Sequence, residues 1–122
     1  MSKIVVAANA MIENTHKITD VLQGTHDSEI FFKYDQKYKW SILKRGDDHY
    51  ALMFYPGRQR LEDLASMPDE YWHEFNEMVS YNSKDLGTKE SLDTFKDLYR
   101  VVNDMKYGMD QVLDEIISSG DF

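Results

Sequence analysis

The chain has 122 residues, carries a net charge of −8 and contains no cysteine. This composition excludes disulfides, thiolate metal sites and cysteine nucleophiles, and the acidity argues against direct nucleic-acid binding, which needs clustered cations. The length predicts a single domain spanning residues 1–122. The apolar run at residues 4–8 is too short for a membrane span, so we expect a soluble, cytoplasmic protein.

The first predicted element is an amphipathic helix over residues 3–23. Its apolar or small side chains recur every three or four positions, at Ile4, Ala8, Met11, Thr15, Ile18 and Leu22. Gly24 is a natural end for such a helix. A strand at residues 4–8 is the alternative, because isoleucine and valine are β-branched.

Three strands come next, since side chains alternate with a period of two over residues 29–35, 38–43 and 50–55. The connections are short, and Pro56 and Gly57 end the pattern. We therefore predict a three-stranded antiparallel β-meander. Its predicted core comprises Ile30, Phe32, Tyr34, Trp40, Ile42, Leu52 and Phe54.

The remaining sequence is helical in pattern. A short helix is expected near residues 61–67, a second from Pro68 to about Asn82, and a long one from Thr88 to about Ser118. The predicted cover of the core comprises Met11, Ile18, Trp72, Phe75, Leu98 and Val102. The fold class is therefore α+β: an N-terminal helix, a three-stranded meander, then two to three C-terminal helices packed on one sheet face.

The last helix is too long for the body that it covers. About thirty residues span about 45 Å, whereas a domain of this size is about 30 Å wide. Either the helix bends at Gly108 and folds back on the first helix, or its end projects and a second copy covers it. We expect a homodimer through this helix.

Charge is divided along the chain. Residues 28–60 carry seven cations against four anions, whereas residues 61–122 carry five cations against fifteen anions. A cluster without a cation, at Asp69, Glu70, Glu74 and Glu77, is the candidate binding surface for a basic partner; a solvated helix face is the alternative.

The basic stretch gives a second candidate site. Arg58, Arg60, Lys39 and Tyr55 could form a basic, aromatic surface for a phosphorylated ligand or single-stranded nucleic acid. The alternative is that the lysines line the solvated sheet face and that Arg58 pairs with Glu62 or Asp63. The second face also carries Phe31, Leu43, Met53 and Tyr55, so either another helix covers it or it is an exposed apolar patch.

No set of residues predicts catalysis. Glu-x-x-His occurs twice, at residues 13–16 and 70–73, which is the spacing of di-metal carboxylate proteins, but the motifs lie off the apolar faces. The run Asp47-Asp48-His49 is expected at a hairpin tip, where polar residues serve the turn. We therefore expect no catalytic residue, no metal site and no cofactor.

The sequence thus predicts a non-enzymatic acidic protein-binding module. An inhibitor, an immunity-type or phage-encoded antagonist of a basic partner, or a small acidic chaperone fits this profile. The alternative is a small-ligand or nucleotide-binding protein that uses the basic aromatic surface, and a metal-dependent enzyme is a third hypothesis.

Overall fold

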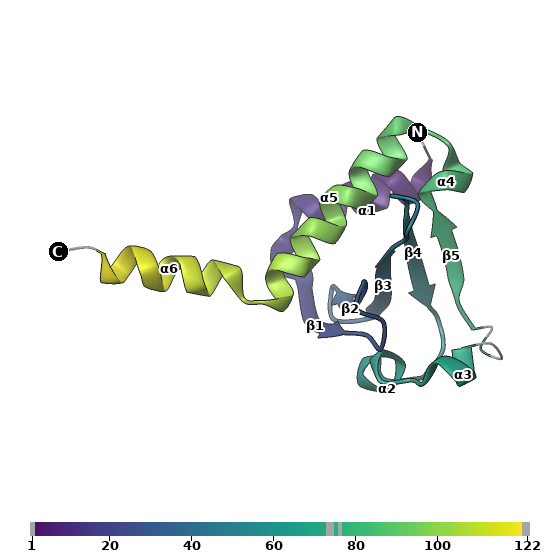
Figure 1. The fold of residues 1–122 in the computed structure, drawn as a ribbon, viewed down its shortest axis with the longest axis horizontal. Helices are drawn as coiled ribbons and strands as arrows, with labels where there is room; N and C mark the ends of the chain where they lie inside the picture. The colour runs from purple at the N-terminus through teal and green to yellow at the C-terminus, as the bar shows by residue number, and fades with distance from the viewer. Residues whose placement is uncertain (1, 73–74, 76, 121–122) are drawn as a thin grey trace.

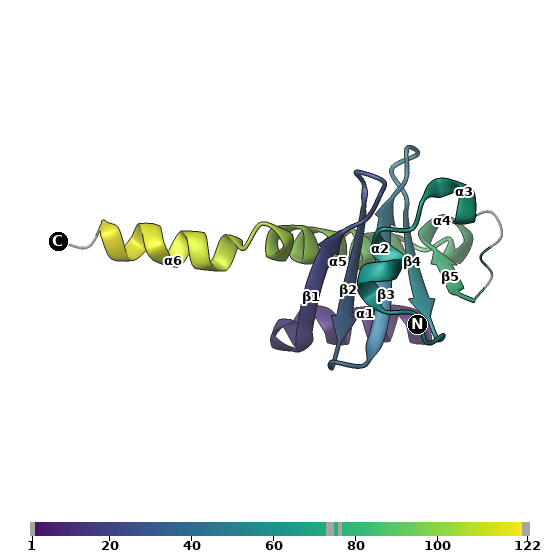
Figure 2. The ribbon, with the colours of Figure 1, turned by 90° about the horizontal axis from the view of Figure 1, so that it is seen from below.

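A five-stranded antiparallel sheet forms the centre of the protein (Figures 1 and 2). The computed structural model describes residues 2–72, 75 and 77–120. The strands run in the order β1-β2-β3-β4-β5. Their bounds are β1 Ile18–Gln23, β2 Glu29–Tyr34, β3 Tyr38–Lys44, β4 Tyr50–Tyr55 and β5 Val79–Asn82. The helices are α1 Lys3–Glu13, the 3-10 turn η1 Thr15–Lys17, α2 Leu61–Ala65, α3 Asp69–Trp72, α4 Ser83–Leu86, α5 Lys89–Lys106 and α6 Met109–Ser119.

The predicted meander is confirmed as the middle of this sheet. Strands β2, β3 and β4 pair in continuous antiparallel register, with Phe32 opposite Trp40 and Trp40 opposite Phe54. The β2–β3 turn places Asp35 and Gln36 at positive φ (56° and 62°), the conformation of a tight hairpin connection.

The first helix is shorter than predicted, and a strand follows it. The side-chain amide of Asn14 donates to the Ala10 carbonyl at 2.8 Å, and the helix ends there. A bulge at Asp20 (φ 54°) lies between Ile18 and Leu22, so these two side chains pack on opposite faces of the sheet. In the sequence these two residues are four positions apart, which is also the spacing of an apolar stripe on a helix, and this explains why the sequence predicts a helix here. The alternative strand at residues 4–8 is wrong, because this run lies within α1.

A second strand replaces the end of another predicted helix. The helix expected from Pro68 to about Asn82 ends at Trp72, and Val79–Asn82 forms β5 against β4. Tyr81 lies opposite Leu52 in this pairing. The free edge of β4 has backbone N–H and C=O groups that need hydrogen-bond partners, and pairing with β5 supplies them. This requirement is not visible in the helical spacing of the apolar residues.

Helices cover both faces of the sheet instead of one. On the first face, α1 and α5 pack on Ile30, Phe32, Ile42 and Leu52, the fully buried part of the predicted core. Tyr34, Trp40 and Phe54 are only half-buried. On the second face, α2 packs on Phe31, Ala51, Met53 and Tyr55. Trp72 and Phe75 belong to this second cluster, so their predicted place over the first face is wrong.

The long C-terminal helix breaks at Gly108, as one alternative predicted. Helix α5 ends at Lys106, and Gly108 adopts a left-handed conformation with φ 63°. Helix α6 does not fold back onto α1; it extends away from the sheet and its covering helices (Figures 1 and 2).

The two covered faces give a direct test. Phe31 and Phe32 are neighbours on β2 that point to opposite faces, and both are buried. We expect Phe31→Ala and Phe32→Ala each to lower the free energy of unfolding by about 3–5 kcal/mol. Lys96→Ala, on the exposed side of α5, should change it by less than about 0.5 kcal/mol. Urea denaturation measures all three; a neutral Phe31→Ala would contradict burial of the second face.

Candidate functional site

The C-terminal helix is the most exposed apolar element in the described part of the chain. We call α6 the arm; its apolar stripe comprises Val112, Leu113, Ile116 and Ile117. Their side chains are 39%, 48%, 60% and 69% exposed. Spacings of three and four residues place them on one side of the helix. An isolated helix of this length is only marginally stable in water, and it becomes more stable when another apolar surface packs on its stripe.

The direction of the arm results from the end of α5. The backbone N–H of Gly108 donates to the Met105 carbonyl at 3.0 Å, and that of Tyr107 donates to the Asp104 carbonyl at 3.2 Å. These bonds close the last turn of α5. The positive φ of Gly108 turns the chain, and the N–H of Val112 then donates to the Gly108 carbonyl at 3.1 Å, which starts the new helix.

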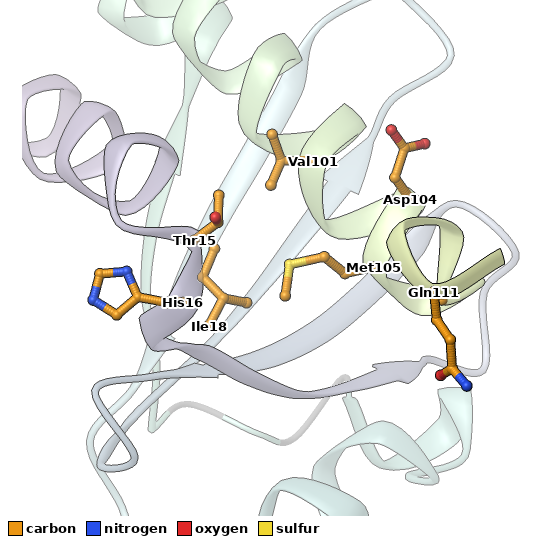
Figure 3. A pocket seen from close by; sticks show the side chains of 8 residues that line it. Thr15, His16, Ile18, Val101, Asp104, Met105 and Gln111 are labelled. Atoms are coloured by element: carbon orange, nitrogen blue, oxygen red, sulfur yellow. The ribbon is translucent and has the colours of Figure 1, made fainter. Parts of the chain in front are cut away.

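An open groove lies at the base of the arm (Figure 3). One wall is the segment that comes after α1, and the other is the end of α5. The groove has a volume of about 680 Å³. Its lining comprises Thr15, His16, Ile18, Val101, Asp104, Met105, Gly108 and Gln111.

The groove has an apolar floor and a polar rim. Figure 3 shows the side chains of Ile18, Val101 and Met105 between the two walls. Ile18 is buried, whereas Val101 and Met105 are half-buried and pack against the edge of the core. Thr15 and His16 are exposed on one rim and Asp104 on the other. Such a floor with a few polar edge groups suits an aliphatic side chain of another polypeptide.

The arm is acidic, whereas the groove carries few charged groups. The arm contains three carboxylates, at positions 110, 114 and 115, and no cation. Lys17 is exposed next to His16, and Lys106 comes directly after Met105. The ammonium of Lys106 donates to Gln23 Oε1 at 2.5 Å and lies 4.6 Å from the Tyr107 ring centre. Neither lysine is among the residues that line the groove, so the titratable side chains of the lining are His16 and Asp104.

The predicted ligand-binding residues do not converge on one open surface. Lys39 Nζ donates to the carbonyls of Gly57 and Gln59 at 2.6 and 2.5 Å, and so ties the segment after β4 to β3. Arg60 Nε donates to Asp63 at 3.1 Å, which raises the pKa of Arg60 and lowers the pKa of the Asp63 carboxyl. Arg58 is exposed, whereas Tyr55 is buried under α2.

Tyr55 belongs to a buried polar chain that sequence reasoning missed. Ser41 Oγ donates to Glu29 Oε2 at 3.0 Å and lies 2.8 Å from the Tyr55 hydroxyl. A serine has one proton to give, so Tyr55 donates to Ser41. Burial raises the pKa of Tyr55 far above its ordinary value, and the nearby charge of Glu29 adds to the effect. A serine and a glutamate at inward-facing strand positions are the signal that could have revealed this chain.

The other predicted residues are exposed, engaged in contacts within the fold, or outside the described range. Glu70 and Glu77 are exposed, while Glu74 and the side chain of Asp69 lie outside the described residues. His73 of the second Glu-x-x-His motif also lies outside them; in the first motif, His16 is on the groove rim and Glu13 is exposed. Nδ1 of His49 is 2.9 Å from Ser83 Oγ, so this residue ties the β3–β4 turn to α4.

Across the described ranges, no group of three or more histidine, aspartate or glutamate side chains could hold a metal ion. None of the helices described is both long and apolar enough to cross a membrane. Comparison of the chain with protein-family models, with curated proteins and with solved structures found no match.

The position of Lys39 predicts a structural effect. We expect Lys39→Met, which keeps the aliphatic stem, to lower the free energy of unfolding by about 1.5–3 kcal/mol, because two carbonyls lose a charged donor. Arg60→Met is the matched control and should have a much smaller effect, since its ion pair is exposed. Chemical denaturation compares them; equal effects would contradict the structural role.

The buried tyrosine predicts a loss of stability in alkali. Its pKa is raised in the folded protein, so the unfolded chain ionises first as the pH rises above about 10. Stability then falls by up to about 1.4 kcal/mol per pH unit from this group alone. Tyr55→Phe removes this component, so the stability difference between wild type and variant should shrink between about pH 9.5 and 11.5. A difference that stays constant would contradict the assignment.

Proposed function

We propose that the protein is a non-enzymatic protein-binding module, and that its docking element is the arm. The observation that carries this proposal is the apolar stripe of α6, whose four aliphatic side chains are 39–69% exposed on a helix that leaves the body of the protein. Full burial of each such side chain stabilises by about 1.5–3 kcal/mol. An amphipathic helix of this kind binds by laying its apolar side into a groove of another protein.

The charge of the arm specifies the chemistry of the partner. The sequence of α6 contains three carboxylates and no cation. A groove with an apolar floor and a basic rim is complementary to this helix, whereas an acidic rim would repel it. The net charge of −8 acts in the same direction at longer range. An antagonist of a basic protein is the functional class that this combination fits.

The absence of enzymatic activity is part of the proposal. Support comes from three polar groups with reactive chemistry that are engaged in structural contacts. His49 ties a turn to α4, Lys39 holds two backbone carbonyls, and Tyr55 donates into a buried chain with Ser41. No cofactor is required by this function.

The test compares what the 122-residue chain binds with and without an intact stripe. The arm variant is Leu113→Asp/Ile117→Asp, and the matched control is Ser118→Asp/Ser119→Asp, which adds the same charge at the end of the arm. We expect the control to retain specific basic proteins from a lysate, as quantified by mass spectrometry, and the arm variant to lose them. Both variants should unfold within about 0.5 kcal/mol of wild type, because the arm lies outside the core.

Identical binding profiles for the two variants would contradict a docking role of the stripe. A loss of binding in both would assign the effect to the added negative charge and not to the loss of apolar contacts.

A further inference from the structure

We propose that the open pocket at the connection between α2 and α3 is a docking site for an arginine side chain of a basic protein segment, which stacks on the exposed ring of Tyr71 beside the carboxylates of the two helices. This surface is separate from the arm, because α6 lies at one end of the molecule and α3 at the other (Figures 1 and 2). The inference therefore goes beyond the proposed function and stands or falls without it.

The α2–α3 pocket is built on a fixed stretch of backbone. The N–H of Tyr71 donates to the Pro68 carbonyl at 3.0 Å, and the N–H of Met67 donates to the Leu64 carbonyl at 3.3 Å. The hydroxyl of Thr25, in the β1–β2 loop, donates to the Met67 carbonyl at 3.3 Å. The pocket has a volume of about 470 Å³, and its lining comprises Asp63, Ser66, Met67, Pro68, Tyr71 and Phe75.

The pocket has an apolar base and an exposed aromatic wall. Met67 and Phe75 are half-buried and pack against the apolar cluster of the second sheet face. Trp72, the neighbour of Tyr71 in α3, belongs to the same cluster and stacks on Phe31 at a ring-centre distance of 6.2 Å. Tyr71, by contrast, is 57% exposed. An exposed ring beside an apolar base offers a flat face to a planar group.

The segment that forms the pocket is acidic. Residues 60–72 contain four carboxylates against one cation, Arg60, which is a local balance of −3. Glu62, Asp63 and Glu70 are exposed. This potential attracts a cationic side chain and repels an anionic one. Arginine fits the pocket better than lysine, because its planar guanidinium both stacks on an aromatic ring and binds a carboxylate through two N–H groups.

The chain itself shows that a carboxylate of this pocket accepts a guanidinium. Arg60 Nε donates to Asp63 Oδ2 at 3.1 Å, and Arg60 Nη2 donates to Asp63 Oδ1 at 3.3 Å. The two side chains are 74% and 57% exposed, so a second guanidinium reaches the same carboxylate from solvent. The positive charge of Arg60 opposes this approach. The proposal therefore predicts that removal of Arg60 strengthens binding.

Tyr71 differs from the other highly exposed tyrosines of the described chain. Lys37 Nζ lies 5.0 Å from the ring centre of Tyr38, and Lys106 Nζ lies 4.6 Å from that of Tyr107. Within the described residues, no lysine or arginine takes this position over Tyr71. The ring of Tyr71 is therefore available to a cation from another molecule.

The first experiment titrates the 122-residue protein with the peptide acetyl-Gly-Arg-Gly-amide and follows the backbone amide shifts by NMR. One matched peptide carries citrulline, an uncharged group of the same shape, and another carries lysine. We expect saturable shifts centred on residues 62–71 with the arginine peptide, and binding at least about tenfold weaker with citrulline and about threefold weaker with lysine. Equal binding of the citrulline or the lysine peptide, or shifts centred elsewhere, would overturn the proposal.

The second experiment repeats the titration on three variants at exposed positions, whose folding is checked by circular dichroism. Tyr71→Leu should weaken binding of the arginine peptide about fivefold, whereas Tyr107→Leu, which removes an equally exposed ring elsewhere, should stay within about twofold of wild type. Arg60→Gln should strengthen binding by about threefold, because the internal competitor for Asp63 is removed. Unchanged binding in Tyr71→Leu, or weaker binding in Arg60→Gln, would overturn the site.

Discussion

The structure depends on one constraint: both faces of the central sheet are apolar, and both must be covered. Phe32 and Leu52 face α1 and α5, while Phe31 and Tyr55 face α2 and the cluster around Trp72. A helix and a long second helix cover the first face, and short helices cover the second. Helix α5, which ends at Lys106, is the last element that packs on the sheet. The arm comes after this point, so its apolar stripe has no sheet left to pack on.

The same constraint explains why the polar residues of the sheet are structural. Where helices cover a face, a strand has no solvated side on which a ligand surface could form; Tyr34, Trp40 and Phe54 remain half-buried. Lys39 reaches the backbone of the segment after β4, and Ser41, Glu29 and Tyr55 satisfy one another under α2. Buried polar groups of this kind destabilise a fold unless they are paired, and here they are. These polar groups of the sheet therefore serve the fold.

The sequence predicts the parts of this fold that have a clean period. Strands β2 to β4 alternate strictly, and α5 has a regular stripe, so both are evident without coordinates. Strand β1 is not, because the bulge at Asp20 puts Ile18 and Leu22 on opposite faces at a helical spacing. Strand β5 is four residues long and is defined by pairing with β4. Alternation assigns Lys39 and Tyr55 to a face of the sheet, but it does not reveal that α2 covers this face or that two carbonyls lie within reach of Lys39.

The arm was predictable for a different reason, which is a matter of length. A helix of about 45 Å cannot lie within a body about 30 Å wide, so the break at Gly108 and the surplus of apolar residues result from the chain itself. The sequence leaves open the direction of the arm, since a glycine at positive φ permits both a return and a departure. In the structure the arm leads away from the sheet, and its first turn borders the groove (Figure 1). The apolar stripe therefore stays exposed, and the proposed docking role rests on this exposure.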